Sequence, residues 1–286
     1  MPFRSSDMAR ARLTRKGRRT GGLAFEAACG RLGRLAINWL SRLADQAGFA
    51  GRIVILTWQG RRGRFGLMAR LTLEEIFKQA FGAIGLIVLV GFMLGFLWSV
   101  LWYGTLGNIG GLENFSTFLI SIHAIQIAPI MTTVIVILRY GAPSTWELAA
   151  MKSGRQFETL AQMGIPPEHY LAAPRIIGTA LTMPALLMLF ILSSCAGSYY
   201  LAWRFNGQAL LEFLFALSNT ARGYHFAIMA FKSAAVSLAL SFFCVYNGFS
   251  INIDNLNGGA LVIRRAMGES FFYCMLASVL ISVLYV

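Results

Sequence analysis

The sequence predicts an all-α integral membrane protein with about five transmembrane helices, preceded by an amphipathic interfacial (elbow) helix. Hydrophobic residues make up 57% of the 286 residues and charged residues only 13%, about half of the usual share. One soluble core cannot bury that much apolar surface. Long stretches without any charge recur along the chain, and a bilayer core of about 30 Å needs about 20 helical residues. These observations exclude a soluble globular, disordered, collagen-like or coiled-coil protein.

The first part of the chain is strongly basic. Residues 1–78 contain 16 Lys and Arg against 5 Asp and Glu. Within them, residues 1–22 are rich in Arg and Gly and are predicted to form a disordered tail. A basic arm can bind nucleic acid, but beside a membrane-spanning chain we favour a cytoplasmic anchor on anionic lipid, with no nucleic-acid partner.

Residues 23–80 are expected to form amphipathic cytoplasmic or interfacial helices. Leu32, Leu35 and Trp39 fall on one helical face, and arginines fall on another. This pattern is typical of a helix that lies on the cytoplasmic leaflet, and the alternative is a helix that packs on a soluble partner. Further on, residues 72–75 (Thr-Leu-Glu-Glu) match a capping box, which predicts the start of a helix that runs into the first span.

Residues 81–286 are expected to form the five-span domain. The uncharged stretches predict spans near the following residues: 82–103, 117–139, 175–202, 226–249 and 267–286. Lys and Arg are concentrated in the alternate connections, so the positive-inside rule places residues 1–80, 140–174 and 250–266 in the cytoplasm. With five spans, the C-terminal Val286 then lies on the external side.

The chain lacks the motifs of a catalytic site. It has no P-loop for ATP, no zinc-protease helix motif and no nucleophile elbow. His123, His169 and His225 are too far apart in sequence to have metal-ligand spacing. The cysteines are isolated, without a disulfide or zinc pattern. We therefore expect no catalytic residue, no metal and no cofactor in this chain.

Two features inside the expected spans are candidates for function. Gly91 and Gly95 form a small-xxx-small pair that would let two helices approach closely, although glycine is also common in membrane helices. Lys232 lies about seven residues into the fourth span, and a cation there is a functional candidate because its burial is costly. We favour the alternative that Lys232 snorkels to the outer interface.

The connection over residues 140–174 has the most structure. Ser144 and Glu147 form an S-x-x-E cap, residues 144–163 follow an amphipathic pattern, and Gly164 is placed to end the helix. A helix over 144–164 that lies along the membrane could be a lever on which a cytoplasmic partner docks, or a simple surface helix. Glu147 would be its key polar contact, or would only stabilise the first turn. The other candidate contacts are Met151, Arg155, Glu158, Met163 and Gly164.

The chain resembles the MlaE family, the ABC-transporter permeases associated with MCE (mammalian cell entry) proteins, without gaps from about residue 124 to 203 and more loosely over 72–286. The family's Glu-Leu-Gly-Pro is Gln-Ile-Ala-Pro at residues 126–129, and its Gly-Arg-x-Gly is Leu-Arg-Tyr-Gly at 138–141. Its Ala-Glu-Ile-Gly-x-Met is Trp-Glu-Leu-Ala-Ala-Met at 146–151. Its long Met-Gly-Val-Asp-Pro motif, which continues to Pro-Arg, aligns with residues 163–175.

This sequence departs from the family pattern at three positions. Gln126 and Arg155 each stand where the family has Glu, and Pro166 stands where it has Asp. Gln126 and Pro129 are the first and last positions of the first motif, and Lys232 also falls where the family has a similar residue. The resemblance therefore implies that these three residues lie near a lipid cavity, from which the Glu charge is missing.

The resemblance further implies a homodimer in a bacterial inner membrane, with a cytoplasmic N-terminus and a periplasmic C-terminus. A cytoplasmic ATPase dimer would bind ATP and dock on the 144–164 helix, and a periplasmic MCE-domain protein would sit on the outer face. A small cytoplasmic STAS-type subunit is a further partner that the family allows. The substrate would be membrane phospholipid or a similar hydrophobic molecule. The alternatives are a membrane-embedded enzyme of lipid metabolism and a scaffold that does not transport.

Overall fold

The computed structural model describes residues 46, 48–49, 51–52, 65–106, 119–206, 210–220, 223–250 and 259–285. The chain divides into two compact units, Met1–Arg52 and Ile53–Val286. The expected basic tail and the amphipathic face around Trp39 lie outside the described residues. All that follows concerns the second unit.

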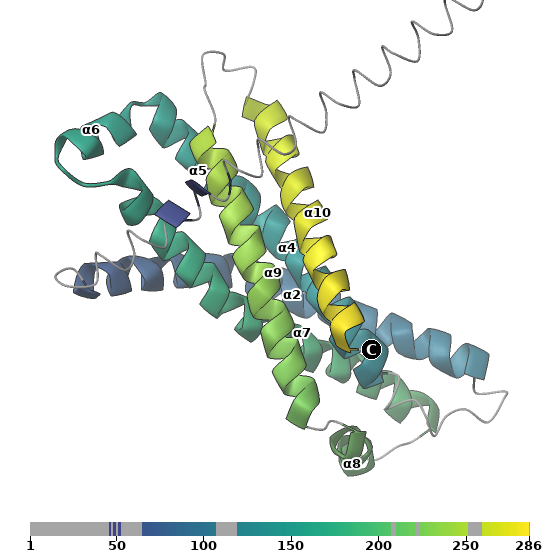
Figure 1. The fold of residues 1–286 in the computed structure, drawn as a ribbon. Coiled ribbons are helices and arrows are strands. Elements are labelled where there is room, and N and C mark those ends of the chain that lie inside the picture. The colour runs from purple at the N-terminus through teal and green to yellow at the C-terminus, as the bar shows by residue number, and fades with distance from the viewer. Residues whose placement is uncertain are drawn as a thin grey trace, which may run out of the picture. The chain divides into compact units, whose positions relative to one another are not determined.

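The described part of the second unit is built from helices, with no strand among these residues (Figure 1). Five helical stretches are long and apolar enough to cross a membrane, as the sequence predicts. The chain is thus an all-α, multi-pass membrane protein. The elements are α2 (Phe65–Leu106), η4 (Leu119–Ile127), α4 (Ala128–Val136), η5 (Ile137–Gly141), α5 (Ala142–Ser153), α6 (Gln156–Gln162), η6 (Glu168–Ala172), α7 (Ala173–Asn206), α8 (Leu210–Thr220), α9 (Gly223–Ser250) and α10 (Gly259–Tyr285).

Helix α2 begins earlier than the capping-box pattern predicts. It is one helix of 42 residues from Phe65, so Thr72 lies inside it rather than at its start. The Thr72 hydroxyl donates to the Met68 carbonyl at 2.8 Å, one turn back in the same helix. Good helix formers occupy most of the positions from Leu67 to Leu71, so the helix is already formed before the capping-box residues and continues through them. At about 63 Å, α2 is twice as long as a bilayer core is thick, so part of it extends beyond the apolar layer.

Helices α2 and α7 pack against each other at very short range. A Cβ atom added to Gly91 would lie 2.9 Å from the Phe190 carbonyl oxygen. A Cβ on Gly95 would overlap the backbone of Ser194, and one on Gly197 would overlap the backbone of Phe92. Gly91 and Gly95 therefore lie where α2 approaches α7 of the same chain closely.

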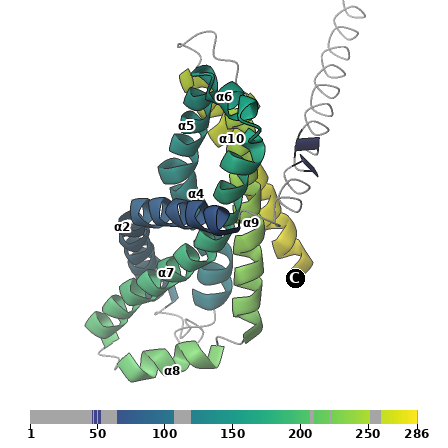
Figure 2. The same ribbon diagram turned by 90° about the vertical axis from the view of Figure 1, so that its left-hand side faces the viewer.

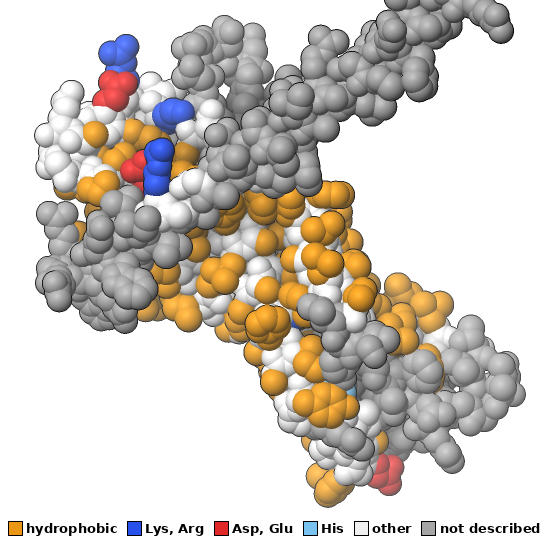
Figure 3. Space-filling model, in the orientation of Figure 1, with side chains coloured by type: hydrophobic (Ala, Val, Ile, Leu, Met, Phe, Trp, Pro, Cys, Tyr) orange, Lys and Arg blue, Asp and Glu red, His pale blue; other side chains and the backbone are white. Residues whose placement is uncertain are grey.

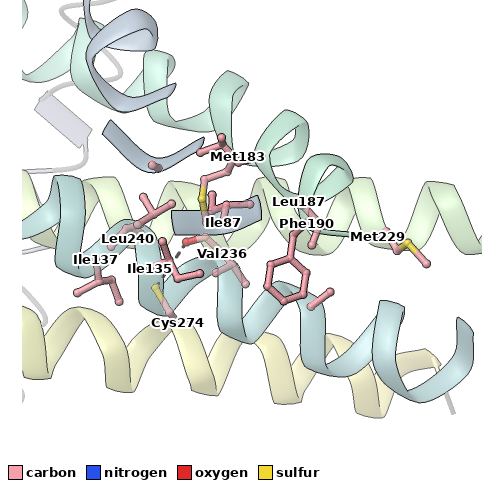
Figure 4. Packing of buried hydrophobic residues seen from close by; sticks show 14 of the residues in the cluster. Ile87, Ile135, Ile137, Met183, Leu187, Phe190, Met229, Val236, Leu240 and Cys274 are labelled. Carbon is pink, nitrogen blue, oxygen red and sulfur yellow. Dashed lines mark hydrogen bonds between the residues drawn. The ribbon is translucent and has the colours of Figure 1, made fainter. Parts of the chain in front are cut away.

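A continuous apolar core joins the spans. Ile87 of α2, Phe190 of α7 and Leu240 of α9 are buried in it, together with Ile135 of α4 and Cys274 of α10 (Figure 4). On the outside, hydrophobic side chains cover the middle of the face shown in Figure 3, and charged side chains gather near its α5 and α6 end. This division is expected when lipid surrounds the middle of the bundle and water its ends.

The structure contradicts the single helix expected over 144–164. The second span continues without interruption through η5 into α5, so Ser144 lies within a helix and caps nothing. The helix then breaks at Gly154 and Arg155, where Arg155 has a left-handed φ of 55°, and α6 follows. Gly164, with φ 73°, ends this region as predicted, because glycine adopts positive φ without steric cost.

The connection between the third and fourth spans contains a helix that the sequence analysis treated as loop. Helix α8 has 11 residues, mostly apolar. It lies at the end of the bundle opposite α5 and α6, as both views of the ribbon show (Figures 1 and 2).

Candidate functional site

Arg175, in the first turn of α7, organises the end of the bundle where α5 lies. Its side chain is only 5% exposed. One terminal nitrogen donates to the carbonyl and hydroxyl oxygens of Ser144 at 2.9 and 3.0 Å. The other pairs with the Glu147 carboxylate at 2.9 Å, and Nε lies 3.4 Å from the Glu75 carboxylate. The planar guanidinium thereby joins α2, α5 and α7 through one side chain.

Tyr140 adds the segment η5 to this group of residues. Its hydroxyl donates to the second oxygen of Glu75 at 2.9 Å. We call Glu75, Tyr140, Ser144, Glu147 and Arg175 the arginine network. A buried guanidinium is tolerated only when its donors are paired, so the network fixes the relative positions of the elements that supply it.

A second set of contacts ties α5 and α6 to α9. The Thr145 hydroxyl contacts the Cys244 carbonyl oxygen at 3.2 Å, and Lys152 Nζ donates to the Phe249 carbonyl at 2.6 Å. The rings of Phe157 and Phe249 lie 4.7 Å apart. We call residues 142–164 the coupling segment. It is bonded directly to α7 and α9, and it is linked to α2 through Arg175, which pairs with Glu75.

The residues predicted to contact an ATPase all lie on the coupling segment. Glu147 is bonded to Arg175, yet its side chain remains 49% exposed. Met151 is partly buried. The remaining four are exposed and lie at the break, on α6 and just after it: Arg155, Glu158, Met163 and Gly164.

Inside the membrane-spanning part, Lys232 forms a polar cluster with residues of other helices. It is 1% exposed, and its Nζ donates to the Ile125 carbonyl at 3.1 Å. It also donates to Gln126 Oε1 at 2.8 Å and to Ser282 Oγ at 2.9 Å. The favoured snorkelling interpretation is therefore wrong: the side chain points into the bundle, because carbonyl and hydroxyl acceptors on η4 and α10 satisfy its donors. We call Gln126, Lys232 and Ser282 the polar cluster.

The structure does not bring all the predicted cavity residues together. Gln126 contacts Lys232, but Pro129 is buried at the start of α4, where it lines a small apolar cavity with Val236 and Cys274. The two glycines of α2 belong to the contact with α7. The five predicted residues thus lie at three separate places. Gln126 and Lys232 belong to the polar cluster, Pro129 to an apolar packing site, and Gly91 and Gly95 to the crossing of α2 and α7.

Sequence reasoning missed several residues of these sites. The sequence pattern places Glu75 in a helix cap, and Arg175 at the edge of a span and at the end of a family motif. An arginine directly after a proline at the start of an uncharged span is the signal that could have pointed to Arg175. Ser282 carries no such signal, because only the packing of α10 on α9 brings it to Lys232.

Nothing in the described part of the chain is arranged as a metal site. Across those residues, no group of three His, Cys, Asp or Glu side chains could hold an ion. His123 contacts the Ser194 hydroxyl, and its ring lies 6.3 Å from that of Phe190, so it is a packed core residue.

Comparison with known proteins gives the same assignment over most of the chain. The family described as permease MlaE matches residues 72–285. A probable ABC transporter permease protein of Synechocystis sp. is 23% identical over 248 residues, which cover 85% of this chain and 87% of the relative. The intermembrane phospholipid transport system permease protein MlaE of Haemophilus influenzae is 24% identical over 125 residues, 43% of this chain and 48% of the relative.

A plant protein is similar to a shorter part of the chain. Protein TRIGALACTOSYLDIACYLGLYCEROL 1, chloroplastic, of Arabidopsis thaliana is 24% identical over 153 residues, which cover 54% of this chain and 42% of the relative. The matched region thus spans about half or less of the plant and Haemophilus proteins. Because the family matches from α2 to the end of α10, the alternatives of a lipid-metabolism enzyme and of a scaffold are set aside. The chain belongs to the MlaE family of ABC-transporter permeases.

Proposed function

We propose that this chain is the membrane subunit of an ABC transporter that moves phospholipid, or a similar hydrophobic molecule, between the bacterial inner membrane and a periplasmic MCE-domain protein. A separate cytoplasmic ATPase dimer supplies the energy, and the permease acts as a homodimer. The family membership supports an ATPase partner. The Haemophilus relative, by its name a permease of a phospholipid transport system, supports phospholipid as the substrate class.

The observation that carries this proposal is the bonding of the coupling segment to the spans. Arg175 of α7, which is itself paired with Glu75 of α2, holds it on one side, and the end of α9 holds it on the other. The second span runs directly into it. A push on α5 and α6 therefore displaces four spans together, which is what an ATPase must achieve to move a lipid between two permease subunits.

The polar cluster provides a means of recognising a lipid headgroup. Gln126 and Ser282 are partly exposed, and the charge of Lys232 lies directly behind them. Among the described residues no carboxylate pairs with Lys232, so its charge is compensated only by dipoles. In a medium of low dielectric, such a charge attracts an anionic phosphate strongly.

The experiment is to purify the chain alone and together with a candidate ABC ATPase of the same organism, both in lipid nanodiscs. The chain alone should hydrolyse ATP no faster than empty nanodiscs, whereas the ATPase should co-purify and hydrolyse ATP. Hydrolysis by the chain alone, or an ATPase that never co-purifies, would contradict the proposal.

A further inference from the structure

Helix α8 has a wider apolar face than the described part of the chain covers. Phe213 is buried, with its ring 5.6 Å from that of Tyr199, and Leu217 is partly buried beside it. Leu211 and Phe215 lie on the same helix but are 68% and 66% exposed. The helix therefore buries one apolar sector against the bundle and leaves a second one uncovered.

A third sector of α8, the polar sector, contains Glu212 and Asn219 with the small side chain of Ala216 beside them. At 100° per residue, Glu212, Ala216 and Asn219 cluster on the side away from Leu211 and Leu214. All of them are exposed. The three sectors of α8 thus suit three surroundings: protein, apolar medium and water.

The ends of the neighbouring spans mark the depth at which α8 lies. Tyr200 and Trp203 are exposed in the last turns of α7, and Tyr224 is exposed in the first turn of α9. Exposed Tyr and Trp side chains at span ends are typical of the membrane–water interface. Helix α8 connects these two ends, and its 11 residues, about 16 Å, are too short to cross an apolar core of about 30 Å.

The uncovered sector is also continuous with the lipid-facing surface of the spans. A groove of about 380 Å³ runs between α8 and the first turns of α9. Its lining is apolar apart from one hydroxyl: Leu211, Leu214, Phe215, Leu217, Ser218 and Phe226. From Phe226, the exposed Ala227 and Ala230 lead around α9 to the exposed Phe231 and Leu238, so the apolar surface continues along this helix.

We propose that α8 lies in the membrane interface, with its uncovered apolar sector immersed in the leaflet opposite the coupling segment. Acyl chains of that leaflet fill the groove, and the polar sector faces water. The continuity with the spans favours lipid as the occupant over a partner protein. This proposal depends on the chain spanning a membrane, and it holds whichever molecule the transporter moves.

Spin labels on single cysteines test the proposal in the full-length chain. The background is the cysteine-free variant C29S, C195A, C244A, C274A, checked for unchanged elution and thermal unfolding. Labels are placed at Leu211→Cys and Leu214→Cys, with Glu212→Cys and Ala216→Cys as matched controls on the same helix. The protein, without partners, is held in nanodiscs of phosphatidylethanolamine and phosphatidylglycerol, and collisions with oxygen and with a water-soluble nickel chelate are measured.

The expected result is an oxygen-to-nickel collision ratio several-fold higher at 211 and 214 than at 212 and 216. High nickel collision at all four positions would overturn the proposal, because the apolar sector would then face water. Protection of 211 and 214 from both reagents would also overturn it, since protein, such as a second copy of the chain, would then cover the sector. Leu211 and Leu214 are tested separately, so one poorly folded variant does not decide the outcome.

Discussion

Glu147 is bonded to Arg175, and we expect it also to contact the docking ATPase. Its carboxylate is bonded to Arg175 inside the arginine network, yet half of the side chain remains open to a docking protein. Arg175 also has Glu75 and Ser144, so the loss of Glu147 does not leave the guanidinium unpaired.

We therefore expect Glu147→Ala and Glu147→Gln to fold and insert, with a stability loss of about 0.2–1 kcal/mol, typical of a partly exposed ion pair. Both should bind the ATPase several-fold more weakly and show lower coupled hydrolysis. Glu212→Gln, an exposed acidic residue at the other end of the bundle, is the control. Wild-type association and hydrolysis in both Glu147 variants would show that this residue serves only the local structure.

The sequence shows that Lys232 is an unusual cation within a span. It does not show in which direction the side chain points. A lysine at that depth can reach an interface as easily as it can reach a neighbouring helix. Only the acceptors on η4 and α10 decide between the two, and they are more than 40 residues away in sequence. Contacts of this kind cannot be read from periodicity.

The variant Lys232→Met should keep its thermal midpoint or raise it, because an apolar side chain of similar length removes the cost of a buried charge. Lipid transfer should fall by about tenfold or more, equivalent to at least about 1.4 kcal/mol of lost headgroup attraction. The measurements are thermal unfolding in nanodiscs and ATP-dependent lipid transfer. Lys78→Met, an exposed lysine on α2, is the control, and normal transfer by Lys232→Met would remove the polar cluster from the substrate path.

At the scale of elements, the crossing of α2 and α7 gives a direct test of the fold. Gly95→Ala would place a methyl group inside the backbone of Ser194, which cannot move aside as a flexible side chain could. We expect a loss of about 1–3 kcal/mol in the free energy of unfolding. Gly85→Ala in the same helix meets nothing within 4 Å and should be neutral or stabilising by about 0.5–1 kcal/mol.

Urea or detergent titration of both variants in micelles provides the comparison. Equal stability of Gly95→Ala and Gly85→Ala would mean that α2 and α7 are not packed at this distance. A larger loss in Gly95→Ala alone would support the crossing.

The five spans can be predicted because each has a long uncharged stretch, and Gly164 can be predicted because a positive φ at a helix end selects glycine. Helix α8 is not predicted, because its 11 mostly apolar residues are too few for a span. The break at Arg155 is not predicted either. The amphipathic pattern continues across residues 144–163, and the left-handed residue is an arginine rather than the preceding glycine.

At the scale of the whole molecule, the topology follows from the asymmetry of Lys and Arg between the connections. Reporter fusions at residue 20 and at Gly154 should be cytoplasmic. Fusions at Leu112 and after Val286 should be external. A cytoplasmic reporter at the C-terminus would be incompatible with five spans and a cytoplasmic N-terminus.

We propose above all that this chain moves a lipid, and that a separate ATPase supplies the energy through the coupling segment. The most direct measurement follows the transfer of a fluorescent phospholipid between two partners. One is a proteoliposome that contains the permease and the ATPase, and the other is a purified MCE-domain protein. We expect that transfer requires ATP and that it stops when the ATPase carries an inactivating substitution in its P-loop. We also expect slower transfer by the Glu147→Gln variant. Transfer at the same rate without ATP, or ATP-dependent transfer that persists when the permease is omitted, would contradict the account.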